Sequence, residues 1–361
     1  MSIRLAACQI VFLGAMLVDV TAIAAPYEVG DATCLNDPEC QIKEEQGKTV
    51  IDKIKETTGG NAKPQVFLMK HQGRFVGVPM GARDVSQIVD LSEAPASGGD
   101  PVWDGYQIGA YYAAPGSDPH QGGQIWQVRF STQEHTRVTD GRCIPVAHLT
   151  RSNACTYQGP IEAAPGRLAF FQQLSVYEDG ELNTTHHLVT VIDGQASVAE
   201  VLEHLPDHLS WSPDREWLLF VEGGELQALD LRGDKPKLCI LPKVSTYQVR
   251  HPEWAGKGMI VYEAAGDIWM VPVKMPNGPK SCPDLRLKQQ VQLTSGSDHD
   301  KDPQWMEASN LIAFTSNRPV DAADTSRRNR IWVGQLGGDV LDPAVSMPFS
   351  IGYADWQIYL K

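Results

Sequence analysis

Six residues that could bind a ligand occupy the same position in a repeated phrase of the sequence. Each lies three residues before an apolar anchor, which is Trp in five of the six phrases. The six residues are Asp100, Gln158, His208, His251, Asp302 and Tyr353. Carboxylate and carbonyl oxygens are ligands of Ca²⁺ and Mn²⁺, whereas imidazole nitrogens favour Mn²⁺ or Zn²⁺. Within this set, His208, His251 and Asp302 are the candidate ligands of a divalent cation, Ca²⁺ or Mn²⁺.

A second interpretation of the same residues is purely structural. The six side chains could form hydrogen bonds with one another, with backbone groups and with water. The Asp-Pro and His-Pro pairs at Asp100, His251 and Asp302 also help the chain to turn into a strand. The sequence leaves both interpretations open and nominates no catalytic residue.

The anchors reveal the elements that must position these residues. They are Trp103, Ile161, Trp211, Trp254, Trp305 and Trp356, separated by 58, 50, 43, 51 and 51 residues. An apolar run follows most of them, as in Leu218-Leu219-Phe220, and a second strand-like box follows that run. Short apolar runs with a period near 50 indicate a β-propeller, in which each repeat forms one blade of three or four strands.

The two ends of the propeller region are predicted to complete one shared blade. The last repeat stops after its first strand at ADWQIYLK, so its missing strands must come from the runs at 66–69, 75–78 and 87–91. A ring closed in this way pairs strands from both ends and removes exposed sheet edges that invite aggregation. The fold class predicted is an all-β, six-bladed propeller. Because the first strand of each blade lines the central channel, the six residues should face one pore.

The repeats resemble those of TolB-like β-propellers, which carry WD40-like repeats. The resemblance lies in WSPDREWLLF from Trp211 and in SDHDKDPQWMEASNLIAFTSNR from Ser297. It covers about residues 95–361 and is weaker where Ile161 replaces Trp and where Ala255-Gly256 replaces Ser-Pro. The resemblance implies a propeller in an exported, periplasmic setting. The 38 residues of 26–63 are too few for the α/β domain that precedes the propeller of TolB itself.

The N-terminal region divides into three predicted parts: a signal peptide at 1–24, an extension with a short helix at 25–63, and the propeller at 64–361. Arg4, the mostly apolar run 5–18 and the small-residue site Ala22-Ile23-Ala24 are typical of a secretory signal. No later stretch is long and apolar enough to anchor the mature chain. We therefore expect a periplasmic or secreted protein without a transmembrane segment.

Six cysteines remain once the signal peptide is removed, an even number that suggests disulfides in an exported chain. They are Cys34, Cys40, Cys143, Cys155, Cys239 and Cys282. The expected pairs are 34–40, 143–155 and 239–282. Cys239 and Cys282 each fall 28 residues after the Trp of their blade, so a bond between them would join two adjacent blades.

The functional expectations follow from charge and from missing motifs. A net charge of −13 argues against nucleic-acid and acidic-lipid partners. The sequence contains no G-x-S-x-G elbow, no H-E-x-x-H and no dinucleotide fingerprint. The leading hypothesis is a non-enzymatic module that binds a protein or glycan of the cell envelope, with no cofactor beyond a divalent cation. The alternative is a metal-assisted lyase or hydrolase with its site in the central channel.

Overall fold

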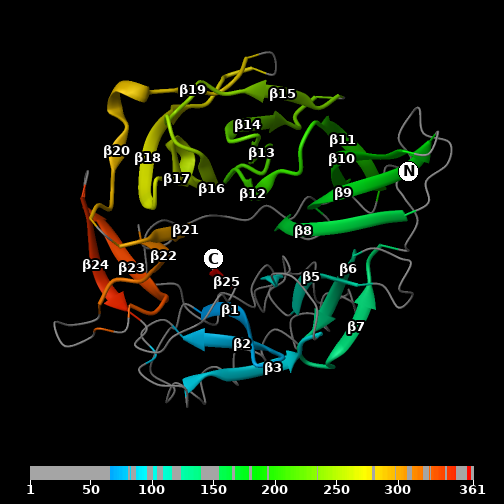
Figure 1. Cartoon of the computed structure of the whole chain (residues 1–361), viewed down its shortest axis with the longest axis horizontal. Coiled ribbons are helices and arrows are strands. Elements are labelled where there is room, and N and C mark those ends of the chain that lie inside the picture. Colours follow the sequence, from blue (N-terminus) through cyan, green and yellow to red (C-terminus); the bar gives the residue numbers. More distant parts are fainter. Residues whose placement is uncertain are drawn as a thin grey trace, which may run out of the picture.

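The chain forms a six-bladed β-propeller. The computed structural model describes residues 66–358, except for 80–81, 83–86, 96–100, 104–108, 116–122, 140–153, 165–166, 179–180, 193–194, 234, 279–280, 297, 307–310, 320–324, 326, 338–339 and 347–355. Within these residues, six antiparallel sheets surround a central axis (Figure 1). The predicted signal peptide (1–24) and N-terminal extension (25–63) lie outside the described residues. The same described part holds no helix that is long and apolar enough to cross a membrane.

The first three blades follow one another along the chain, each as a sheet of four strands. Blade 1 contains β4 (Val102–Trp103), β5 (Gly109–Pro115), β6 (Gly123–Arg129) and β7 (Glu134–Arg137). Blade 2 contains β8 (Ala154–Ala164), β9 (Arg167–Glu178), β10 (Glu181–Ile192) and β11 (Gln195–Leu202). Blade 3 contains β12 (Asp207–Trp211), β13 (Trp217–Glu222), β14 (Glu225–Asp230) and β15 (Lys237–Ile240).

The remaining blades complete the ring. Blade 4 contains β16 (Val249–Ala255), β17 (Met259–Ala264), β18 (Asp267–Lys274), β19 (Asp284–Leu285) and β20 (Val291–Gln292), with the 3₁₀ helices η3 (Gly256–Gly258) and η4 (Leu287–Gln289). Blade 5 contains β21 (Asp300–Met306), β22 (Leu311–Ser316), β23 (Arg330–Gly337) and β24 (Val340–Ser346). Blade 6 contains β25 (Trp356–Ile358), β1 (Val66–His71), β2 (Arg74–Pro79) and β3 (Val89–Glu93).

Strands from both ends of the propeller region close the ring within blade 6. The last strand, β25, pairs antiparallel with β1, so that Leu68 lies opposite Gln357. β1 then pairs with β2, and β2 with β3. This pairing confirms the predicted six-bladed fold and its shared blade, although β3 begins two residues later than the predicted run at Gln87.

The second strands of blades 3 and 5 are apolar because neighbouring blades cover them. All six residues of β13 are buried, and β22 is buried from Ile312 onward. A strand covered on both faces reads as a continuous apolar run rather than an alternating one. Gly223 and Gly224 then turn the chain into β14 with φ values of 60° and 84°, as a tight hairpin turn requires.

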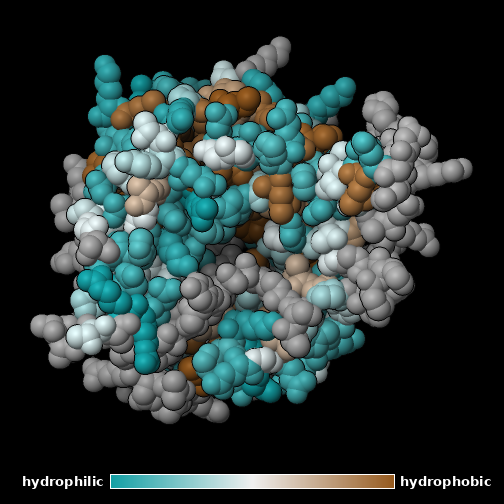
Figure 2. Space-filling model, in the orientation of Figure 1, coloured by the Kyte–Doolittle hydropathy of each residue, from teal (hydrophilic) through white to brown (hydrophobic). Residues whose placement is uncertain are grey.

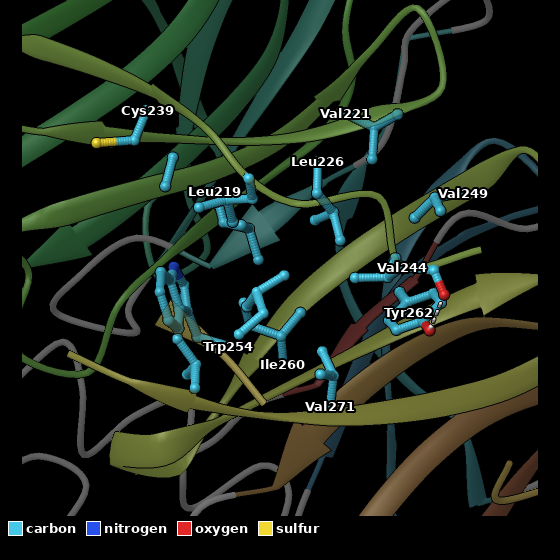
Figure 3. Close-up of a cluster of buried hydrophobic side chains, with 14 of the residues drawn as sticks. Leu219, Val221, Leu226, Cys239, Val244, Val249, Trp254, Ile260, Tyr262 and Val271 are labelled. Carbon is cyan, nitrogen blue, oxygen red and sulfur yellow. Dashed lines mark hydrogen bonds between the residues drawn. The ribbon is translucent and has the colours of Figure 1, made fainter. Parts of the chain in front are cut away.

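The Trp anchor of blade 4 packs between two blades. Figure 3 shows Leu219 and Leu226 of blade 3 facing Trp254, Ile260 and Tyr262 of blade 4. Trp254 is 3% exposed. Burying a large apolar side chain of this kind contributes about 1.5–3 kcal/mol. The contact therefore fixes β16, and with it the residue three positions earlier, His251.

A disulfide also joins these two blades. Cys239 on β15 is bonded to Cys282, which lies just before β19, with a Cα–Cα distance of 5.7 Å. This bond confirms the predicted link between neighbouring blades. Cys155 on β8 is disulfide-bonded as well. Its predicted partner Cys143 lies outside the described residues, as do Cys34 and Cys40.

Candidate channel site

The first strands of blades 3, 4 and 5 each contain a β-bulge at the equivalent position. These first strands are β12, β16 and β21, and they lie toward the centre of the ring in Figure 1. The pairing of each with its second strand is interrupted, at His208, His251 and Asp302 respectively. These residues have positive φ values of 51°, 43° and 53°. His and Asp are among the non-glycine residues that most often adopt this region, which still costs about 1–3 kcal/mol.

Blade 2 has the same bulge, but a glycine occupies it. The register of β8 shifts between Gln158 and Ile161, and Gly159 has a φ of 59°. Gly159 precedes Pro160 just as His251 precedes Pro252. Gln158 therefore lies one residue before the position equivalent to His251. Asp100 and Tyr353, the other two predicted members of the ring, lie outside the described residues.

His251 is the centre of the site. Its Nδ1 atom lies 3.2 Å from Oε2 of Glu263 and 3.1 Å from Oδ1 of Asp302. On the other side of the ring, Nε2 lies 3.7 Å from Oδ1 of Asp207. The side chains of His251 and Asp302 are 29% and 30% exposed, and that of Glu263 is 15% exposed. The site is thus partly shielded from solvent yet still accessible.

His208 lies beside this centre and has its own carboxylate. Its Nε2 atom is 3.6 Å from Oε2 of Glu253, which belongs to the neighbouring strand β16. The imidazole rings of His208 and His251 meet edge to face, with centroids 5.7 Å apart. The structure therefore brings together His208, His251 and Asp302 from three consecutive blades.

The carboxylates around His251 determine its charge. Burial favours the neutral imidazole, but the hydrogen bond with Glu263 and the negative charges of Asp302, Asp207 and Glu263 outweigh it. Together they raise the pKa of His251 to about 9. In the absence of another cation, His251 is protonated at neutral pH.

Sequence reasoning missed Glu263, Asp207 and Glu253. Glu263 lies on the second strand of blade 4, opposite Arg250, the residue just before the bulge. The equivalent residues in blades 3 and 5 are Val221 and Thr315. Glu263 is a carboxylate in an otherwise apolar strand, and aligning the second strands of the blades would have marked it as a candidate residue of the site.

The acidic segment 298–302 does not form one site, because its aspartates have separate partners. Asp298 pairs with Arg327 at 2.9 Å. Asp300 is buried and pairs with Arg318 at 2.6 Å. Asp302 alone faces His251. The bulge at Asp302 accounts for this divergence, because it redirects one side chain relative to its neighbours.

Chemically, the site is suited to a cation. One imidazole nitrogen and two carboxylate oxygens, of His251, Glu263 and Asp302, lie within 4.8 Å of one another. Figure 2 shows hydrophilic residues over β16, β21 and β22 on this face.

The fold defines the class: this is a six-bladed β-propeller. No protein-family model and no curated protein matches the chain. Among solved structures, it is similar to TolB from Acinetobacter baumannii, with 13% identity and a TM-score of 0.50 over 88% of this chain and 73% of that one. It is also similar to hydrazine synthase from Kuenenia stuttgartiensis, with 13% identity and a TM-score of 0.51 over 82% of this chain and 46% of that one. At this identity the likeness shows the fold alone.

Proposed function

We propose that this protein is an exported β-propeller that binds a protein or glycan of the cell envelope. The observation that carries the proposal is an extension of blade 2 beyond the ring. In blade 3, Val221 of β13 pairs with Asp207, the residue just before the bulge, and β13 ends one residue later. In blade 2 the equivalent residue is Phe171, and β9 continues through residues 172–178. This continuation is roughly 20 Å long, and β8 and β9 reach past the neighbouring blades in Figure 1.

Within the part of the chain that the structure describes, the extension offers an open strand edge. β10 begins at Glu181, but its described pairing with β11 starts only at His186. Residues 181–184 are exposed, and Leu182 is 63% exposed. An exposed strand edge can accept a strand from a partner through backbone hydrogen bonds, while neighbouring side chains provide specificity. A large apolar residue beside such an edge favours a protein partner over a glycan.

Export is the second part of the proposal. The sequence at 1–24 has the features of a signal peptide, and the bond between Cys239 and Cys282 is typical of proteins in oxidising compartments. Both observations support a periplasmic or secreted location.

Capture from an envelope extract with the tagged full chain tests the binding function. Lysine at an edge strand blocks strand addition, so Leu182→Lys/Thr184→Lys should recover at least tenfold less of the captured component than the wild-type chain. Ile240→Lys is the matched control, because Ile240 is 67% exposed on the outer strand of blade 3. Failure of the wild-type chain to recover any reproducible component, or equal recovery by the double variant, would refute the proposal.

A second candidate function is metal-assisted lyase or hydrolase chemistry in the central channel. The convergence of His251, Glu263 and Asp302 on one point favours it. A bound metal together with activity that disappears in a folded His251→Ala or His208→Ala variant would support it. Retained activity in both folded variants would exclude it.

A further inference from the structure

We propose that one divalent cation binds in the channel through Nδ1 of His251, Oε2 of Glu263 and Oδ1 of Asp302. The inference deepens the second candidate function, but it does not require catalysis. It differs from the expectation based on sequence, because Glu263 replaces His208 as the third ligand.

The distances suit ligands that share an ion. Ligand atoms about 2.0–2.2 Å from one ion lie about 3.0–3.4 Å apart when they are neighbours in its coordination shell. The Nδ1 atom of His251 is already 3.2 Å and 3.1 Å from the two carboxylate oxygens. The three residues come from β16, β17 and β21, which the packing of two blades holds in place.

The charges around this point favour an added cation. The carboxylates of Asp207, Glu253, Glu263 and Asp302 all lie within 4 Å of an imidazole nitrogen of His208 or His251. Lys301 supplies a positive charge nearby, with Nζ 3.9 Å from Oδ2 of Asp302. Four carboxylates thus surround two histidines and one lysine. A divalent cation would compensate this excess of negative charge.

Asp207 completes an outer contact that metal-binding histidines commonly make. Its Oδ1 atom faces Nε2 of His251, on the opposite side of the ring from Glu263 and Asp302. At 3.7 Å this is a charge contact rather than a hydrogen bond, and it favours the tautomer with its proton on Nε2, which leaves the Nδ1 lone pair for the ion. Cation binding displaces any proton on Nδ1. His208 remains with Glu253, outside the coordination shell.

The ligand set indicates which ion binds. One imidazole nitrogen with two carboxylate oxygens suits Mn²⁺ or Zn²⁺, whereas Ca²⁺ takes six to eight oxygen ligands. Three protein ligands leave coordination positions open for water or for an oxygen of a bound ligand. The site would therefore serve either a binding or a catalytic role.

Isothermal titration of the full chain with Mn²⁺, Zn²⁺ and Ca²⁺, combined with metal analysis after dialysis, tests the inference. We expect one Mn²⁺ or Zn²⁺ per chain and weaker binding of Ca²⁺. Glu263→Gln and Asp302→Asn should each weaken metal binding at least tenfold. Asp207→Asn should weaken metal binding by about 10–100-fold, the usual effect of removing a carboxylate that contacts a metal-binding histidine. Asp284→Asn is the control, because Asp284 is an exposed carboxylate on β19 of the same blade.

If a variant fails to fold, spectroscopy on the wild-type chain provides the test instead. Co²⁺ substituted for the native ion should give ligand-field bands that report a mixed nitrogen and oxygen site, and bound Mn²⁺ should show loss of the free-ion signal in electron paramagnetic resonance. Absence of binding by all three ions would overturn the inference, as would binding that Glu263→Gln and Asp302→Asn leave unchanged. Binding without any activity would leave the inference standing and remove only the second candidate function.

Discussion

At the scale of single residues, the bulge position explains both what the sequence reveals and what it hides. His208, His251 and Asp302 could be selected from their spacing to the Trp anchors, because all three blades repeat the same local geometry. In blade 2 the same rule selected Gln158 through the anchor Ile161, whereas the residue with positive φ at the bulge is Gly159. The positive φ of the bulge residue, rather than its spacing from the apolar anchor, defines which residue of each blade is equivalent.

Glu263 could not be predicted from spacing to an anchor. It reaches the site from the second strand, and its proximity to Asp302 depends on how blade 4 packs against blade 5. Contacts between blades follow from tertiary packing, which no local pattern records.

A buried ion pair in blade 3 predicts the response of stability to acid. Asp230 is 2% exposed, and Arg232 holds its carboxylate with two contacts of 2.8 Å. Burial opposes ionisation of Asp230, but the hydrogen bonds and charge of Arg232 outweigh it and hold its pKa below the usual 3.8. Because the pKa is lower in the folded state, the pair stabilises the fold above about pH 4, and this contribution is lost as the pH falls through the folded-state pKa.

Asp230→Asn should therefore lower the free energy of unfolding at pH 7 by about 1–3 kcal/mol and make its decline below pH 4 less steep than in the wild-type chain. Denaturant titrations at pH 7, 4 and 3 measure both effects. Asp284→Asn removes a carboxylate that is 61% exposed. It should therefore change neither the free energy of unfolding at pH 7 nor its decline below pH 4. An unchanged acid slope in Asp230→Asn would contradict the assignment.

At the scale of elements, blades are joined by packing, by Arg232 and by a disulfide. The guanidinium of Arg232 lies over the ring of Trp217 and also donates hydrogen bonds to the carbonyl groups of Pro276 and Gly278 in blade 4. The bond between Cys239 and Cys282 closes a loop with a sequence separation of 43 residues. Both links hold blade 3 against blade 4, where the site lies.

The disulfide leads to a prediction about stability. Replacing both cysteines, in Cys239→Ser/Cys282→Ser, should lower the free energy of unfolding by about 2–4 kcal/mol, because the unfolded chain regains the freedom of the opened loop. Thermal unfolding with and without reductant measures this. Reductant should destabilise the wild-type chain far more than the variant, and an equal response would show that this bond does not contribute.

The sequence predicted most strands but not the length of blade 2. Apolar runs such as Leu218-Leu219-Phe220 mark second strands clearly, because both faces are buried. The extension of β9 and β10 alternates buried residues such as Leu174 and Val176 with polar ones, so it has no continuous apolar run. From the sequence alone, the polar residues of this extension could not be distinguished from those of a loop.

At the scale of the whole molecule, closure of the ring was predictable because an incomplete last repeat requires strands from elsewhere. The pairing of β25 with β1 meets that requirement and leaves no first strand of blade 6 unpaired. Closure also fixes the angles between blades, and these angles bring β12, β16 and β21 close enough for their bulges to meet. The channel site is therefore a property of three neighbouring blades rather than of any one blade.

Crystallography with manganese tests the account most directly. A crystal structure of the full chain grown with Mn²⁺, with anomalous data collected near the manganese edge, should show β25 paired with β1. It should also show one strong anomalous peak in the channel, bounded by His251, Glu263 and Asp302. A channel without an anomalous peak, or a peak held by other residues, would contradict it.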